Sequence, residues 1–218
     1  MKWLAYFSLL FLLLFSCNKK TTIENNSSKI TKVVYFEING VFENFYPKKV
    51  YLNKIIENTF YPIDSSNVIE NKFNFKGIVD YPERFAFTYE NSALSTIIII
   101  ENKPIQIVLN VKNLQEPIIS GSPLNIELET YKNNSKKIFK KIDFLFPQFQ
   151  KARLENDAEK LLEIEKNMRA IENEFTKFTF NYIQQNNNSF VSAMLLRDHL
   201  KVSKIDSLKI SELYKNLS

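Results

Sequence analysis

The class of fold is decided by residues 105–131, which read IQIVLNVKNLQEPIISGSPLNIELETY. Up to Val111, large apolar residues occupy alternate positions, and this period of two is typical of a β-strand with one buried face. From Ser122 onward the apolar residues recur every three or four positions, which is the spacing of an amphipathic α-helix. Ser122 is a favourable N-cap and Pro123 a favourable first helical residue. We therefore predict an α+β protein in which a β domain gives way to helices at residue 122.

Short segments with the strand period fill residues 30–121, which we assign to the β domain. Their apolar residues include Val34, Phe36, Ile38, Val50, Leu52, Phe73, Phe75, Phe85, Phe87, Tyr89, Ile105, Ile107 and Leu109. Residues 97–100 are four consecutive isoleucines, which we expect in the core. Asn39-Gly40 predicts a turn. Strands of this length and spacing predict an antiparallel β-sandwich or a barrel-like domain.

Residues 122–218 are predicted to form a helical hairpin followed by short C-terminal helices. Two apolar series with heptad-like spacing define the hairpin: Leu128, Tyr131, Ser135, Ile138, Ile142, Leu145, Phe149 and Ala152, then Leu161, Ile164, Met168, Ile171, Phe175, Phe178 and Tyr182. The polar residues around Asn156 separate the two series, and Asp157 is a favourable N-cap for the second helix. A short loop between two such helices makes them antiparallel.

Three further features set the expected helix ends. Pro147 is predicted to kink the first helix or to end it near Phe146, because proline lacks the backbone N–H. The three asparagines at residues 186–188 should end the second helix. A short apolar helix is then expected from Ser189, and an amphipathic one over residues 202–217.

The N-terminus has the features of an export signal. Lys2 precedes an uncharged and mostly apolar run at residues 3–15, which is long enough for a signal peptide and too short to span a bilayer. The run stops at Leu14-Phe15-Ser16-Cys17, which resembles the lipobox of bacterial lipoproteins. We predict a lipoprotein signal peptide at residues 1–16, and a lipid anchor on Cys17 with a polar tether at residues 17–29. An ordinary signal peptide followed by a chance cysteine is the alternative.

Composition excludes several kinds of chemistry. The 218 residues are 44% hydrophobic and 24% charged, as in ordinary globular proteins. One Cys, one His and three Gly are too few for a Cys/His zinc site, a Cys-x-x-Cys redox motif or a glycine-rich phosphate loop. We therefore expect no metal, no cofactor and no identifiable catalytic residue. The net charge of +5 is mild, and we expect no nucleic-acid partner because an exported protein rarely meets one.

Lysines recur at helical spacing on the first hairpin helix, away from its apolar series. They are Lys132, Lys136, Lys137, Lys140 and Lys141. As a functional feature they would form a basic contact face for anionic lipid or an acidic partner. The alternative, which we favour, is an ordinary solvated helix face.

Two other groups of polar residues resemble catalytic sets only superficially. His199 follows Asp198, and the hydroxyls of Ser189, Ser192 and Ser203 are close in sequence, but no segment resembles a nucleophile elbow. We therefore predict a structural or surface histidine. The pairs Glu127/Glu129 and Glu163/Glu165 are two residues apart, and such residues do not face each other on a helix.

Several short motifs together resemble a known family. They are Phe36-Glu37-Ile38-Asn39-Gly40, Val50-Tyr51-Leu52, Phe73-Asn74-Phe75-Lys76-Gly77, Pro82-Glu83-Arg84-Phe85, and Ile119-Ser120-Gly121-Ser122 with Asn125 beyond. This pattern resembles the N-terminal domain of unknown function, numbered 4369, of lipid-anchored bacterial thiol-disulfide oxidoreductases. The resemblance implies a β-rich domain and a helical stretch, with a thioredoxin-like catalytic domain expected beyond Leu217. Thiol–disulfide exchange needs a second thiol, so this chain is not expected to catalyse it alone.

These observations leave three hypotheses for function. The first is an exported, lipid-anchored cell-envelope protein with a non-catalytic binding or presentation role, on the periplasmic side of the outer membrane. The second is an accessory or truncated form of a thiol-disulfide oxidoreductase that docks a separate thioredoxin-like protein. The third is a hydrolase with an unrecognised site. The expected partners are the membrane, through the lipid anchor, and an envelope protein.

Overall fold

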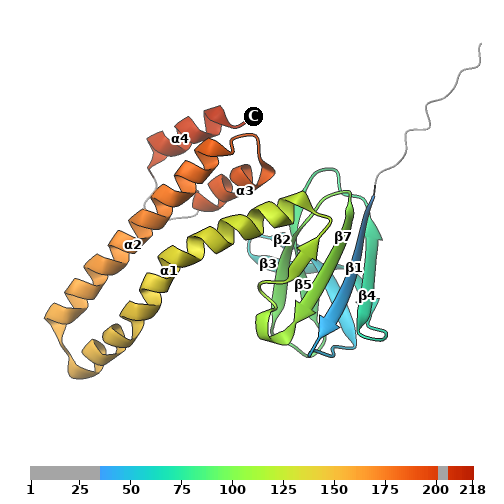
Figure 1. The fold of residues 1–218 in the computed structure, drawn as a ribbon, viewed down its shortest axis with the longest axis horizontal. Coiled ribbons are helices and arrows are strands. Elements are labelled where there is room, and N and C mark those ends of the chain that lie inside the picture. The colour runs from blue at the N-terminus through green and yellow to red at the C-terminus, as the bar shows by residue number, and fades with distance from the viewer. Residues whose placement is uncertain (1–34, 201–205) are drawn as a thin grey trace, which may run out of the picture. The chain divides into compact units, whose positions relative to one another are not determined.

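A computed structural model describes residues 35–200 and 206–218 of the chain. Within these residues eight strands precede four α-helices (Figure 1). The strands are β1 (Phe36–Glu43), β2 (Lys49–Ile56), β3 (Thr59–Asn67), β4 (Lys72–Gly77), β5 (Glu83–Tyr89), β6 (Ser95–Ile100), β7 (Pro104–Asn110) and β8 (Ile118–Ser120). A single 3₁₀ turn, η2 (Val111–Asn113), follows β7. This order of elements confirms the predicted α+β class.

The strands form two four-stranded sheets with the orders β4-β1-β7-β8 and β3-β2-β5-β6. All neighbouring strands are antiparallel except β1 and β7, which pair in parallel with Ile38 opposite Ile105. The predicted sandwich is confirmed, and the antiparallel pattern is interrupted by this one ladder. The two parallel strands are not consecutive: the chain passes through β5 and β6 of the second sheet before β7 returns to the first sheet and pairs with β1.

The core of the sandwich lies between the two sheets and is rich in phenylalanine and isoleucine. The alternate residues Phe36, Ile38, Phe73, Phe75, Phe85, Phe87, Ile105, Ile107 and Leu109 are all buried in it. Phe75 from one sheet stacks on Phe87 from the other, with ring centroids 5.7 Å apart. Burying apolar surface in this way stabilises the fold by roughly 25 cal/mol per Å².

The expected turn at Asn39-Gly40 is wrong, because β1 continues through both residues. Gly40 is needed for close packing instead. A Cβ atom at Gly40 would lie 2.0 Å from the ring of Phe73, which covers it from β4.

The four-isoleucine run forms the end of β6 and is buried on two sides. Ile98 and Ile100 belong to the sandwich core, whereas Ile99 packs among the helices. Ile97 is 42% exposed, so the expectation that the whole run is core holds for three of its four residues.

Strand β3 was not predicted, because it lacks the alternation that sequence patterns detect. Almost all of its residues are exposed, since it is the edge of its sheet. Pro62 lies where the register with β2 shifts, an edge position that tolerates a missing N–H.

The helices are α1 (Pro123–Glu155), α2 (Ala158–Gln185), α3 (Phe190–His199) and α4 (Ser207–Asn216). Ser122, Asp157, Ser189 and Asp206 cap them, each accepting a bond from a backbone N–H in the first turn. Asn156 joins α1 to α2 in the left-handed conformation, with φ of 53°. Figure 1 shows the two long helices as the predicted antiparallel hairpin.

Most of the predicted helix ends agree with the structure. Helix α1 begins at Pro123, and α2 ends before the three asparagines. The alternative that Pro147 ends the first helix is wrong, because α1 continues through it to Glu155. Of the expected last helix, residues 202–205 lie outside the described residues, and α4 supplies the rest.

The predicted signal, tether and anchor lie outside the described residues, which begin at residue 35. Among the helices that the structure describes, none combines the length and apolar character needed to cross a bilayer.

Candidate functional site

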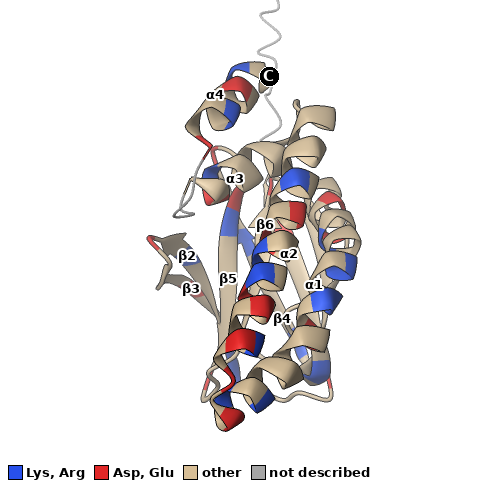
Figure 2. Cartoon of the chain, turned by 90° about the vertical axis from the view of Figure 1, so that its left-hand side faces the viewer, with Lys and Arg blue, Asp and Glu red and all other residues tan. Residues whose placement is uncertain are grey.

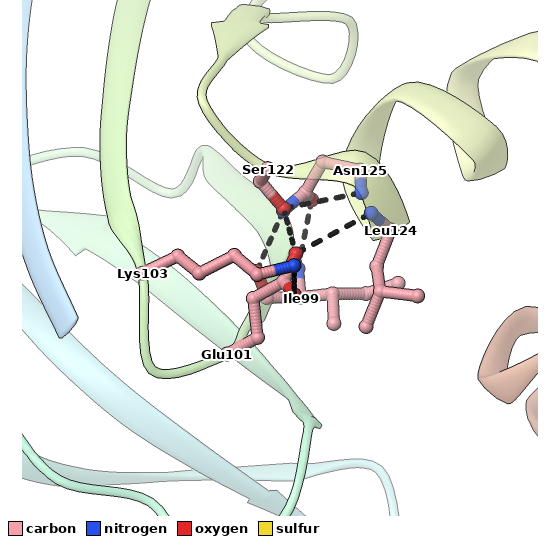
Figure 3. A network of polar contacts seen from close by, with 6 residues as sticks. All are labelled: Ile99, Glu101, Lys103, Ser122, Leu124 and Asn125. Atoms are coloured by element: carbon pink, nitrogen blue, oxygen red, sulfur yellow. Dashed lines mark hydrogen bonds and ion pairs between the residues drawn. The ribbon is translucent and has the colours of Figure 1, made fainter. Parts of the chain in front are cut away.

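The first turn of α1 is bonded directly to β6 through Asn125. The Asn125 side chain is buried; its Oδ1 accepts a bond of 2.9 Å from Ile99 N–H, and its Nδ2 donates one of 2.6 Å to Ile99 C=O (Figure 3). The same Nδ2 donates to Ser122 Oγ at 2.7 Å. One asparagine therefore satisfies both backbone groups of Ile99 and ties them to the helix cap.

A buried carboxylate completes this network. Glu101, in the β6–β7 connection, is 7% exposed and accepts a 2.8 Å bond from Ser122 Oγ. Leu124 N–H also points at this carboxylate, and Lys103 forms an ion pair with it at 2.8 Å. A negative group at a helix N-terminus is favourable because the unpaired N–H groups there carry partial positive charge. The network thus fixes where α1 leaves the sandwich.

Beyond this junction, α1 and β8 enclose a cleft with a volume of about 460 Å³. We call it the β8–α1 cleft and define it by Ile97, Glu116, Ile118, Ile126, Lys132 and Lys136. Its apolar side chains are accessible: Ile97, Ile118 and Ile126 are 42%, 72% and 52% exposed. Strand β8 is the edge of its sheet and pairs only with β7 among the described strands.

An ion pair forms the polar rim of the β8–α1 cleft. Lys136 Nζ lies 2.7 Å from Glu116 Oε1. The hydrogen bond from Lys136 lowers the pKa of Glu116, and the nearby charge of Lys132 lowers it further. The cleft therefore offers exposed aliphatic surface and a strand edge, with charges of both signs at its rim.

The five lysines of the predicted basic face are divided among different surroundings. Lys132 and Lys136 line the β8–α1 cleft, whereas Lys141 forms an ion pair with Glu174 of α2 at 2.7 Å. Lys137 and Lys140 are exposed, with no ion pair in the part of the chain that the structure describes. Figure 2 shows basic and acidic positions interspersed along the two long helices. The five lysines thus do not point in one direction.

A second concave surface lies between α3 and α4, with a volume of about 720 Å³. Its lining is almost wholly apolar and includes Ala193, Leu196, Leu200, Ile210, Tyr214 and Leu217. We call this the α3–α4 groove. Sequence reasoning missed both concave surfaces, because each depends on how separate elements meet.

Asp198 and His199 make separate structural contacts. Asp198 accepts two hydrogen bonds from Arg84 of β5, at 2.6 and 2.7 Å, and so joins α3 to the β domain. His199 is half-buried beside the rings of Phe175 and Phe180, and burial lowers its pKa.

The serines near His199 also differ in their surroundings. Ser189 caps α3, and Ser192 Oγ is buried without a hydrogen-bond partner among residues 35–200 and 206–218. Ser203 lies outside the described residues. The hydrolase hypothesis stays a prediction.

The acidic pairs serve to join helices or to form surface ion pairs. Glu127 accepts hydrogen bonds from Tyr182 and Ser189, at 2.6 and 2.5 Å, and so links α1 with α2 and with the cap of α3. Burial, aided by the Glu127 charge, raises the pKa of Tyr182. Glu163 and Glu165 pair with Lys160 and Arg169 on the surface of α2. In the described ranges, no three His, Cys, Asp or Glu side chains are placed to hold a metal ion.

The fold and the junction define a two-sheet β domain that continues directly into a capped helix. Residues 36–128 match the family model described as "Domain of unknown function (DUF4369)". The match covers all eight strands and the first turns of α1, including Asn125. Comparison with curated proteins found no match, and neither did comparison with solved structures.

Proposed function

We propose that this chain is an exported, lipid-anchored protein of the bacterial cell envelope with a non-catalytic binding role. The anchor is supported by the sequence, in which Cys17 directly follows an apolar run that begins after Lys2. Two or three acyl chains on Cys17 would hold the protein stably, at about 0.8 kcal/mol per buried methylene. The folded part would then face the periplasm from the outer membrane.

The binding role is supported by the β8–α1 cleft, and its ligand is a polypeptide segment in extended conformation. The observation that carries this proposal is an edge strand, β8, whose exposed Ile118 lines the cleft together with the exposed Ile97 and Ile126. An extended peptide can add to a sheet edge through its backbone, while pockets beside the edge select its side chains. Ile97, Ile118 and Ile126 would receive apolar side chains of such a peptide.

The junction at Asn125 supports the same proposal, because it holds α1 in place before any ligand arrives. Preformed sites lose less conformational entropy on binding than sites that must be ordered. The charge at the rim is balanced between Glu116 and Lys136, so apolar contact and backbone pairing would supply most of the affinity.

Peptide binding is tested with a random-peptide phage library selected on the parent protein. Peptides enriched on the parent should bind Ile126→Arg at least about tenfold more weakly, because a charge would occupy the cleft. Ile69→Arg is the matched control, since Ile69 is 71% exposed and lies outside the cleft. If no peptide is enriched, or if both variants bind as the parent does, the peptide role is wrong.

The anchor is tested separately by Cys17→Ser. This variant should lose its lipid and leave the detergent phase, whereas the parent should partition into it. A variant that stays as membrane-bound as the parent would contradict the lipoprotein proposal.

A thioredoxin-like envelope protein is our second candidate, as the specific partner. It is supported by the match of residues 36–128 to DUF4369, together with the family resemblance of the sequence motifs. A photo-crosslinking residue at Ile126 in intact cells should capture such a protein, and the same residue at Ile69 should not. Capture of a different protein from position 126 would leave the peptide role standing and reject this partner.

A further inference from the structure

One end of the sandwich carries exposed apolar and aromatic side chains close to where the chain enters it. Tyr35 directly precedes β1, and the first pair of the β1–β4 ladder is Phe36 with Gly77, so Ile78 lies at the same end as Tyr35. Tyr81 follows in the β4–β5 connection. The three side chains are 50%, 62% and 64% exposed. We call Tyr35, Ile78 and Tyr81 the entry-end surface.

Hydrogen bonds hold this surface in a defined shape. Val79 N–H donates to Asn102 Oδ1 at 3.0 Å, and Asn102 Nδ2 donates to Val79 C=O at 2.6 Å. These bonds join the β4–β5 connection to the β6–β7 connection. Val79 also packs against the sandwich core, so Ile78 and Tyr81 are presented from a fixed loop.

The lysines near this end are balanced by carboxylates. Lys76 pairs with Glu37 at 2.9 Å, and Lys103 pairs with Glu101 at 2.8 Å. Among the described residues, the entry-end surface therefore has no excess of positive charge to attract anionic lipid. Two of its three side chains are tyrosines, which are enriched at membrane–water interfaces. There a tyrosine places its ring in the apolar region and its hydroxyl in water.

We infer that the entry-end surface rests on the bilayer interface, with Tyr35, Ile78 and Tyr81 in the headgroup region. This inference depends on the proposed lipid anchor at Cys17. Tyr35 follows Cys17 by eighteen positions in the sequence. Eighteen residues reach at most about 65 Å even when fully extended, so the anchor would limit how far the entry end can lie from the bilayer. The opposite end of β1 is farther away by the strand's length, roughly 25 Å for eight residues.

The test uses tryptophan fluorescence, since the one tryptophan of the sequence, Trp3, lies in the predicted signal peptide and would be removed before the tests. The precursor is expressed and lipidated, and the mature protein is reconstituted into phosphatidylcholine vesicles, with or without brominated acyl chains. Tyr81→Trp places one reporter on the entry-end surface, and Tyr35→Trp is a second. Tyr46→Trp is the matched control, because Tyr46 is 71% exposed and follows the other end of β1.

The expected result is a shift of the tryptophan emission from positions 81 and 35 to shorter wavelength, with loss of intensity in brominated vesicles. Emission from position 46 should stay unchanged. Adding phosphatidylglycerol should not increase the quenching, because the lysines are paired. Equal quenching at all three positions, or none at positions 35 and 81, would overturn the inference. Flotation of the vesicles separates the two proposals: a protein that floats without quenching keeps its anchor, whereas one that does not float refutes both.

Discussion

Gly40 shows how a single residue determines the packing of the sandwich. It lies in the middle of β1, and the Phe73 ring from β4 occupies the space where a side chain would be. A glycine within a strand is otherwise unfavourable, because it adds backbone freedom to the unfolded chain and packs nothing. Its presence here is explained by the ring that covers it.

Gly40→Ala should therefore destabilise the protein by about 1–3 kcal/mol, as overpacked cores typically do. Denaturant unfolding measures this change. Phe73→Leu provides the partner for a double-mutant cycle, since a smaller side chain should relieve the clash with the new methyl group. Strict additivity of the two changes would mean that the Phe73 ring is not what requires glycine.

His199 is the only histidine in the chain, so it gives stability a distinct pH dependence. Burial lowers its pKa in the folded state, and the folded protein therefore binds its proton less readily than the unfolded chain. Stability should be unaffected by this group above its unfolded pKa of about 6.5 and should fall as the pH drops from there toward the lowered folded value.

Protonation of His199 can lower the free energy of unfolding by no more than about 1.4 kcal/mol per pH unit, because one proton is involved. The loss is smaller than this limit because the ring is half-exposed. Urea unfolding at about pH 7.5 and pH 5.5 measures it, in a range where other side chains with ordinary pKa values barely titrate. His199→Gln should be less sensitive to this change of pH than the parent. An unchanged pH dependence in the variant would assign the effect to another group.

At the scale of elements, the hairpin is held together by its apolar series and the sandwich by alternating strands. Ile138, Leu145, Ile164 and Ile171 form a buried cluster between α1 and α2. Further along, α2 buries Thr179 and Ile183, which the predicted series did not include. A straight α-helix has about 3.6 residues per turn, so residues that repeat every 3.5 positions gradually rotate around its surface. The buried face of α2 therefore shifts to other residues near its end, where α3 and α4 pack against it.

Ile171→Ala should destabilise the protein by about 2–5 kcal/mol, because Ile171 is 7% exposed in the middle of the hairpin. Glu172→Ala is the matched control, since Glu172 is the exposed neighbour and should change stability by no more than about 0.5 kcal/mol. Both substitutions introduce the best helix former, so the difference measures packing. Equal shifts of the denaturation midpoint would contradict the hairpin packing.

At the scale of the whole molecule, the β domain and the helices share buried contacts. Ile99 extends from β6 into the helical cluster, Asn125 returns from α1 to the backbone of Ile99, and Arg84 bonds Asp198 of α3. We therefore expect the sandwich and the helices to unfold together, because each completes the other's buried surface.

Asn125→Ala should weaken this coupling by leaving the N–H and C=O of Ile99 buried without partners. Each such group costs about 1–3 kcal/mol, so the protein should lose at least that much stability. Hydrogen exchange should show faster opening at Ile99 and in the first turn of α1. Asn133→Ala, on the exposed side of the same helix, should leave exchange there unchanged. If the two variants behave alike, the network does not couple the two parts.

Local sequence patterns are enough to predict the class of fold, the place where strands give way to helices, and the hairpin. These features follow from local patterns: the alternation of Phe73 and Phe75, the cap at Ser122, and the spacing of Ile164 and Ile171. Local physics also accounts for the helix ends, because capping involves only residues a few positions apart.

Four features could not be predicted from local patterns: the parallel pairing of β1 with β7, the edge strand β3, the role of Gly40 and the β8–α1 cleft. Each arises from residues far apart in the chain that the fold brings together, such as Ile38 with Ile105 and Gly40 with Phe73. Of the residues that line the candidate site, Lys132 and Lys136 had been considered from the sequence only as part of a basic helix face, and Glu116 and the exposed isoleucines had not been singled out. A periodic pattern tells which side of an element is apolar. Whether another element covers that side, and which element does so, depends on how the whole chain packs.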